Sequence, residues 1–219
     1  MNRTDYARLG ETVYSEVLPN GLRVCVIPKR GFARKYAFFA ANYGAVHTAF
    51  TLDGRLHTTP DGVAHYLEHK TFDMERGNAL QMFAQRGASP NAFTSYQMTA
   101  YHFECTDSFE ENLRLLLSFV SVPYFTEETV EKERGIIAQE IREDQDSPDS
   151  AVYDTLLRQL YAAHPLRDPV IGDLDSIREI YGEEQMDALK KNLAVQKAIS
   201  LVADAAVETD MPAEENKGE

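Results

Sequence analysis

The sequence predicts an α+β protein whose strands come mainly before its helices. The runs 12–18 and 22–28 are rich in β-forming residues and flank Asn20-Gly21, a dipeptide typical of the tight turn of a β-hairpin. Farther along the chain, apolar residues return at helical spacing, most clearly at 126–145. Antiparallel hairpins combined with helices in mixed order indicate an α+β fold.

The other elements follow from local patterns: caps and helical periodicity for helices, β-rich runs for strands, and turn-forming residues for loops. In the first half we expect a strand at 36–44, a loop at 45–60, a helix from the N-cap Asp61 to Phe72, a helix at 77–86 and paired strands at 91–97 and 99–106. In the second half we expect helices at 108–122 (N-cap Ser108, capping-box Glu111), 126–145 (N-cap Thr126), 147–164 and 183–207, with a short helix after a Pro/Gly-broken loop before the last.

Composition narrows the class of protein. The chain has 219 residues and a net charge of −13, with no basic stripe, which argues against a nucleic-acid partner. No apolar run reaches the roughly 18 residues of a membrane span, and the first residues lack a signal-peptide core. Two cysteines, Cys25 and Cys105, fit two buried thiols in a reducing compartment. We therefore expect a cytoplasmic protein with no membrane partner.

One short motif carries chemistry. His65 and His69 are four positions apart, so on a helix both imidazoles can reach one ion, and Glu68 lies on the same side. Zinc accepts imidazole nitrogens, and a nearby carboxylate can take a proton from water and pass it to a leaving amine. The alternative is an exposed helix with two ordinary histidines.

The helix at 126–145 supplies further carboxylates. Its apolar stripe is formed by Val130, Ile137 and Ile141, and Glu133 and Glu140, seven positions apart, fall on the same stripe. Carboxylates on an apolar face are costly unless they are paired or bind a metal. The two carboxylates are explained better if one binds a metal and the other supports a ligand. The alternative is that they form buried ion pairs with Arg or Lys.

The H-x-x-E-H order resembles the inverzincin signature, and the chain is similar to the pitrilysin/insulinase family of zinc peptidases. The resemblance covers about residues 15–180 and implies a zinc metallopeptidase-like domain at 1–180. It implies a mixed, largely antiparallel sheet with helices on one face. The segments that carry it are PDGVAHYLEHKTFD, RGASPNAFTSYQMTAYHF, FTEETVEKERGIIAQEI and HPLRDPVIGDLDSI.

This resemblance also implies roles for individual residues. His65, His69 and Glu140 would bind Zn²⁺, Glu68 would be the general base that activates a zinc-bound water, and Glu133 would support a ligand. The segment 91–95 resembles the edge strand on which a peptide substrate pairs, which makes Asn91 and Ala92 substrate contacts. For these two the alternative is an ordinary hairpin strand.

The resemblance stops near Ile180, where the last strands of the half-domain and the second half of the family fold are expected and do not follow. Residues 181–207 weakly resemble the C-terminal helix of the trigger-factor chaperone, or form an ordinary amphipathic helix, and an acidic disordered tail is expected up to Glu219. A truncation, a chimera and a natural split subunit all remain open. The predicted function is a zinc-dependent metalloendopeptidase domain that hydrolyses peptides. The alternative is a truncated or noncatalytic peptide-binding subunit of a two-part peptidase, which needs a partner half for activity. The expected protein partner is a second peptidase half or a related noncatalytic subunit.

Overall fold

The computed structural model describes residues 1–52 and 54–180, in two compact units, one at 1–28 and one from Lys29 onward. The predictions for 181–219 lie outside the described residues. No helix among the described residues has the length and apolarity that crossing a membrane requires.

The first unit is a three-stranded antiparallel sheet, ordered β1-β2-β3, of β1 (Asn2–Tyr6), β2 (Glu11–Val17) and β3 (Arg23–Val26). The predicted hairpin is confirmed: Gly21 adopts φ +88° in its turn, and Asn20 Oδ1 accepts a hydrogen bond from the Leu22 amide. Strand β1 was not predicted, because all its residues are exposed and leave no apolar pattern. The prediction of two buried thiols is wrong for Cys25, which is exposed in β3, and right for Cys105.

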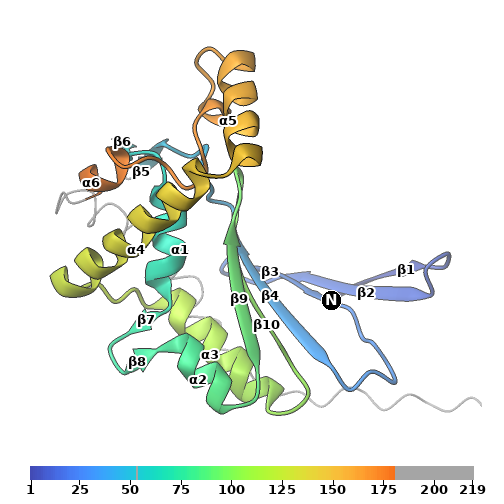
Figure 1. Ribbon diagram of the computed structural model, residues 1–219. Coiled ribbons are helices and arrows are strands. Elements are labelled where there is room, and N and C mark those ends of the chain that lie inside the picture. Colours follow the sequence, from blue (N-terminus) through green and yellow to red (C-terminus); the bar gives the residue numbers. More distant parts are fainter. Residues whose placement is uncertain (53, 181–219) are drawn as a thin grey trace, which may run out of the picture. The chain divides into compact units, whose positions relative to one another are not determined.

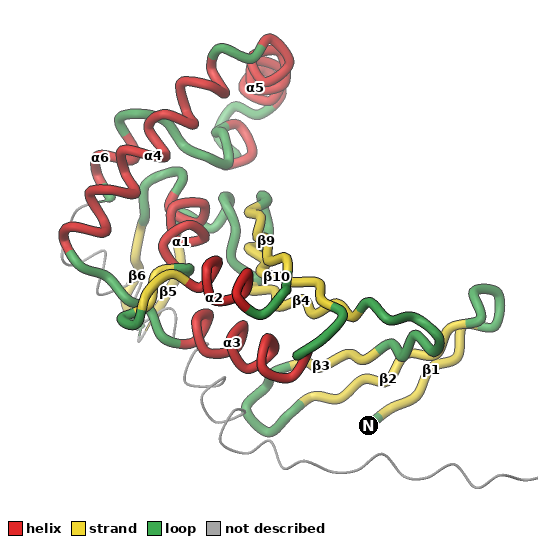
Figure 2. Tube along the Cα trace, turned by 60° about the horizontal axis from the view of Figure 1, so that its bottom comes forward, coloured by secondary structure: helices red, strands yellow, loops and turns green. Residues whose placement is uncertain are grey.

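The second unit contains the sheet β4-β10-β9, formed by β4 (Lys35–Ala41), β10 (Thr99–Cys105) and β9 (Ser89–Thr94). All pairs are antiparallel, and β9 is an edge strand. Helices α1 (Val63–Thr71), α2 (Ala79–Gln85) and α3 (Phe109–Ser121) lie on one face of this sheet (Figure 1, Figure 2). The predicted α+β fold with helices on one face is therefore confirmed.

Beyond α3 the chain forms the helices α4 (Glu127–Gln145), α5 (Pro148–Leu160), the 3₁₀ turn η1 (Pro165–Arg167) and α6 (Ser176–Glu179). A two-stranded pair, β7 (Asp73–Met74) and β8 (Gly77–Asn78), links α1 to α2. The loop predicted at 45–60 is wrong, since β5 (Ala49–Leu52) and β6 (Arg55–Thr58) form a hairpin there. The dipeptide Asp53-Gly54 between them is a hairpin signal in the sequence.

Helix caps were predicted with mixed success. Thr126 caps α4 as expected, accepting a hydrogen bond from the Thr129 amide. Asp61 is not the cap of α1, because the chain turns into that helix at Gly62, with φ +81°. Ser108 adopts φ 52° and makes no side-chain cap bond to α3, so the predicted capping box with Glu111 does not form.

The core that positions the site lies where α1 packs on α4. The predicted stripe is confirmed, with Val130, Ile137 and Ile141 all buried against residues of α1. The buried residues of this core are Val63, Tyr66, Leu67, Val130, Ile137, Ile141, Ile177 and Ile180. In Figure 1, α1 lies between α4 and β9, so the same helix can present groups to both.

Candidate metal centre

Helix α1 carries the motif residues, and the chain enters it through a close backbone contact. A Cβ atom on Gly62 would lie 2.5 Å from the carbonyl oxygen of Ile171, so only glycine fits there without displacement. One turn later His65 and His69 lie on one face of α1, with their ring centroids 4.6 Å apart. The local i, i+4 spacing is what brings the two imidazoles together.

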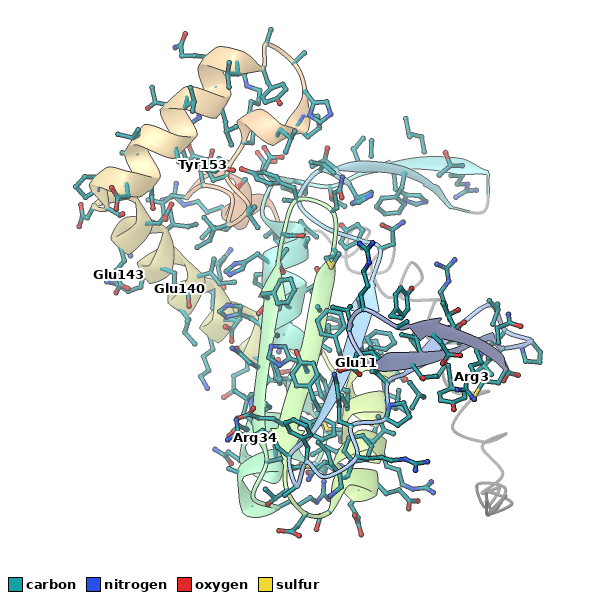
Figure 3. All side chains as sticks on the ribbon, turned by 90° about the vertical axis from the view of Figure 1, so that its right-hand side faces the viewer. Arg3, Glu11, Arg34, Glu140, Glu143 and Tyr153 are labelled. Atoms are coloured by element: carbon teal, nitrogen blue, oxygen red, sulfur yellow. The ribbon has the colours of Figure 1, made fainter. Side chains whose placement is uncertain are left out.

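Helix α4 adds carboxylates to this pair of imidazoles. Glu140 Oε2 lies 3.6 Å from His69 Nε2 and 3.9 Å from His65 Nε2. Glu133, two turns earlier, places Oε1 2.8 Å from His69 Nδ1. Figure 3 labels Glu140 and Glu143 on α4, and of the two Glu140 lies nearer to α1.

The donor set fits a metal ion. One ligand atom from each of His65, His69 and Glu140 lies within 4.8 Å of the other two. In a tetrahedral zinc site with bonds near 2.0–2.1 Å, neighbouring ligand atoms are separated by about 3.4 Å. The two imidazole–carboxylate separations exceed this value by only a few tenths of an ångström, which small side-chain rotations can close. Two imidazoles and one carboxylate are also the ligand types that leave a position open in catalytic zinc sites.

The two histidines differ in how their remaining ring nitrogen is satisfied. The Nδ1–H of His69 donates to Glu133, which orients the ring and directs Nε2 toward Glu140. His65 Nδ1 is buried and has no hydrogen-bond partner in the described part of the chain. Only His69 therefore shows the ring-to-carboxylate support common around metal-binding histidines.

Glu68 is 8% exposed and lies one position before His69 on α1. The hydroxyl of Thr94, near the end of edge strand β9, donates to Glu68 Oε2 at 2.8 Å. Thr94 Oγ1 also lies 3.5 Å from Thr99 Oγ1 on the neighbouring strand β10. A side chain of the edge strand thus holds the carboxylate of the motif.

The three motif residues differ in the direction and cause of their pKa shifts. Burial, and then the neighbouring His69, lowers the pKa of His65 to about 4, so its imidazole is neutral at pH 7. Burial raises the pKa of Glu68, while the Thr94 hydrogen bond and His69 act in the opposite direction. For His69, burial lowers the pKa, but the Glu133 hydrogen bond and the nearby carboxylates outweigh it and leave the pKa raised.

A family model decides the relationship. The model described as Insulinase (Peptidase family M16) matches residues 53–174. The matched range includes His65, Glu68, His69, Glu133 and Glu140. The chain belongs to the insulinase family of peptidases.

Relatives in the insulinase family share both sequence and fold with this chain. An uncharacterised zinc protease, YmfH of Bacillus subtilis, is 46% identical over 178 residues, which are 80% of this chain and 42% of that protein. An M16-like peptidase from Alicyclobacillus acidocaldarius matches with a TM-score of 0.80 and 35% identity, over 92% of this chain and 51% of that one. A structure titled as a peptidase M16 inactive domain, from Pseudomonas fluorescens, shares the fold at 20% identity, with a TM-score of 0.67 and coverage of 80% and 42%. The chain thus spans about half the length of these relatives.

The residues predicted as substrate contacts lie on the edge strand of this insulinase-family domain. Asn91 is exposed, and its Oδ1 accepts a hydrogen bond from the amide of Ala92 at 2.9 Å. The Ser95 amide donates to the Met98 carbonyl oxygen across the turn between β9 and β10. Amides alternate in direction along a strand, so the Ala92 amide points away from β10, toward the free edge of the sheet. Ala92 is two positions before Thr94, so the free edge and the Glu68 contact belong to one short strand.

Sequence reasoning missed Thr94 and Tyr66, two residues around the insulinase-family site. Thr94 contacts Glu68 across 26 positions, and the Tyr66 hydroxyl donates to the Val130 carbonyl oxygen across 64. No local pattern signals the first. Tyr66 lies inside the motif, and the polar tip of an otherwise buried tyrosine was the available signal, because such hydroxyls usually find a partner.

Proposed function

We propose that this chain is the zinc-binding part of a metalloendopeptidase that hydrolyses peptides or partly unfolded segments. The observation that carries the proposal is the convergence of ligand atoms of His65, His69 and Glu140 to within 4.8 Å of one another. Glu68 lies on α1 together with the two histidines. A relative that is named a zinc protease and is 46% identical supports zinc as the metal. A cytoplasmic location remains a prediction.

The protein groups take distinct roles in this proposal. Zinc, when bound, supplies Lewis acidity that polarises a carbonyl and eases the deprotonation of water. Glu68 accepts the proton of the attacking water and transfers it to the leaving amine. Thr94 keeps one carboxylate oxygen of Glu68 fixed by its hydrogen bond, which leaves the other oxygen for the proton. Glu133 holds the ring of His69 in place.

A peptide substrate would pair with the free edge of β9. Backbone groups on an edge strand bind an extended peptide by adding it to the sheet, which gives affinity with loose sequence preference. The Ala92 amide points to this edge, and Asn91 Oδ1 bonds it when no peptide is there. A bound peptide would replace Asn91 Oδ1 as the acceptor for the Ala92 amide. It would then lie near Glu68, because Thr94 of the same strand is hydrogen-bonded to Glu68.

The second candidate is a subunit that binds peptide but needs a partner half, or a related noncatalytic subunit, for turnover. It is favoured by one observation, that the chain spans about half of its relatives. In that case the partner would supply the groups that stabilise the oxyanion of the reaction. In this case the chain alone binds zinc and does not turn over.

A peptidase assay with zinc analysis separates the two candidates. Purified wild-type chain and Glu68→Gln are compared on an internally quenched peptide, each with its zinc content measured. The metalloendopeptidase predicts stoichiometric zinc in both and hydrolysis only by wild type. Stoichiometric zinc with no hydrolysis by either supports the subunit that needs a partner. Equal hydrolysis by both proteins contradicts the role of Glu68.

A further inference from the structure

The hydroxyl of Tyr66 joins the two helices that supply the proposed ligands. Tyr66 is 1% exposed on α1, directly after His65, and its hydroxyl donates to the carbonyl oxygen of Val130 at 2.9 Å. Val130 lies on α4 three positions before Glu133 and ten before Glu140. This bond therefore ties the motif helix to the backbone of the helix that carries the carboxylates.

The separation of the ligand atoms depends on where α4 lies along α1. Apolar packing between these helices is non-directional and does not by itself fix a sliding position. The direct contacts from His65 and His69 reach α4 through carboxylate side chains, which have several rotatable bonds. Tyrosine has two side-chain angles, and here the packed core holds its ring, so its bond to a backbone oxygen fixes the position of the helix itself.

We propose that Tyr66 is a positioning residue for metal binding: its bond to Val130 sets the register of α4 against α1 and so the reach of Glu140 toward His65 and His69. The proposal rests on the proposed function, because it presupposes that these three residues bind the metal. Groups that orient metal ligands from outside the coordination sphere typically change metal affinity by 10- to 100-fold. Tyr66 acts through a helix, which places the expected effect near the lower end of that range.

The test replaces Tyr66 by phenylalanine, which keeps the buried ring and removes only the hydroxyl. The matched control is Tyr101→Phe: Tyr101 is 5% exposed, and its hydroxyl donates to Thr71 Oγ1 at 3.1 Å, a bond that does not involve α4. For both variants and wild type, zinc affinity is measured on the full chain by chelator competition, and the cobalt(II) absorption spectrum reports ligand geometry. Thermal melts of the metal-free proteins report the stability lost with each hydroxyl.

The expected result is a similar decrease in melting temperature for both variants, with zinc affinity about tenfold weaker in Tyr66→Phe and within twofold of wild type in Tyr101→Phe. The cobalt spectrum should change only in Tyr66→Phe. Unchanged zinc affinity in Tyr66→Phe overturns the positioning role, and so does equal weakening in both variants, which would indicate general loosening. If wild type binds no zinc, the proposed function itself fails, and the positioning role fails with it.

Discussion

At the scale of single residues, Glu68 experiences opposing effects. Burial at 8% exposure favours its neutral form and raises its pKa, whereas the Thr94 hydroxyl and His69 favour the carboxylate. A general base must be ionised to accept a proton, so the Thr94 bond supports the proposed role of Glu68 through its charge as well as its orientation.

Replacing Thr94 by valine should raise the pKa of Glu68 further, because the hydroxyl donor that stabilises the carboxylate is lost while the burial remains. Titration of the Glu68 side-chain ¹³C resonance in the metal-free protein measures this directly. Thr94→Ser keeps the donor and should titrate close to wild type. A valine variant with an unchanged or lower pKa would contradict this view of the contact.

Asp61 gives a pH prediction away from the site. Burial, followed by the charges of Asp168 and Asp173, raises the pKa of Asp61. The folded protein therefore holds this proton more tightly than the unfolded chain, and the favourable contribution present below the unfolded pKa is lost as the pH rises through the folded pKa. Asp61→Asn should increase the unfolding midpoint in urea at pH 7, and the gain should disappear at acidic pH. A gain that is equal at both pH values would exclude this carboxyl as its source.

The residues that could be predicted from sequence are those whose relationship is local. His65, Glu68 and His69 share one helix, and Glu133 and Glu140 share another, so helical spacing alone places each set on one side. The contacts between sets could not be predicted this way, because His69 meets Glu133 across 64 positions and Glu68 meets Thr94 across 26. There the family resemblance supplied the connection to Glu140 and marked 91–95 as an edge strand, but nothing in the sequence pointed to the contact of Thr94 with Glu68.

At the scale of elements, the site depends on α1 being held between α4 and β9. The chain enters α1 at a glycine whose backbone packs on Ile171, and α4 contains a glycine, Gly135, between Glu133 and Glu140. A Cβ atom has room at Gly135 but not at Gly62, so replacement by alanine should have opposite effects on stability at the two positions.

Gly135→Ala should stabilise the protein by about 0.5–1 kcal/mol, since glycine is a poor helix former. A Cβ atom at this position meets nothing within 4 Å, so no clash offsets the gain. Urea unfolding followed by circular dichroism measures the change. Loss of stability in this variant would show that α4 requires the glycine for a reason that helix propensity does not include.

Gly62→Ala is the counterpart and should destabilise by at least about 1 kcal/mol, because Gly62 has φ +81°. Its Cβ would also lie 2.5 Å from a backbone oxygen, which cannot move like the end of a flexible side chain. The same unfolding experiment applies. A neutral result would mean that the entry to α1 tolerates a shift of Ile171.

Helices and strands were predicted correctly where hydrophobic periodicity was strong. Predictions failed where a tight turn or the backbone angle at a helix start determined the structure. The stripe of Val130, Ile137 and Ile141 identified both α4 and its buried face. The hairpin at 49–58 was missed because its strands are four residues each and too short to alternate visibly. The cap at Ser108 failed because its backbone adopts φ 52°, where its side chain makes no bond to the start of α3.

At the scale of the whole molecule, the chain spans about half of its insulinase-family relatives and holds every residue of the proposed metal site. Metal binding and folding should therefore be linked in this chain alone. Zinc at about 100 times its dissociation constant would stabilise the folded state by about 2.7 kcal/mol, or roughly 5–10 °C in melting temperature. Thermal melts with zinc and with excess chelator test this, and identical melting temperatures would exclude a tight site.

The central claim is that Glu140 joins His65 and His69 in binding one zinc ion, and a titration of zinc into the metal-free protein by calorimetry tests it most directly. Glu140→Gln is compared with Glu143→Gln, a control three positions along α4 whose exposed carboxylate accepts a hydrogen bond from Gln139. We predict one zinc per chain for wild type and Glu143→Gln, with affinity reduced by at least about tenfold in Glu140→Gln. Equal affinity in all three proteins, or no binding by wild type, would contradict the claim.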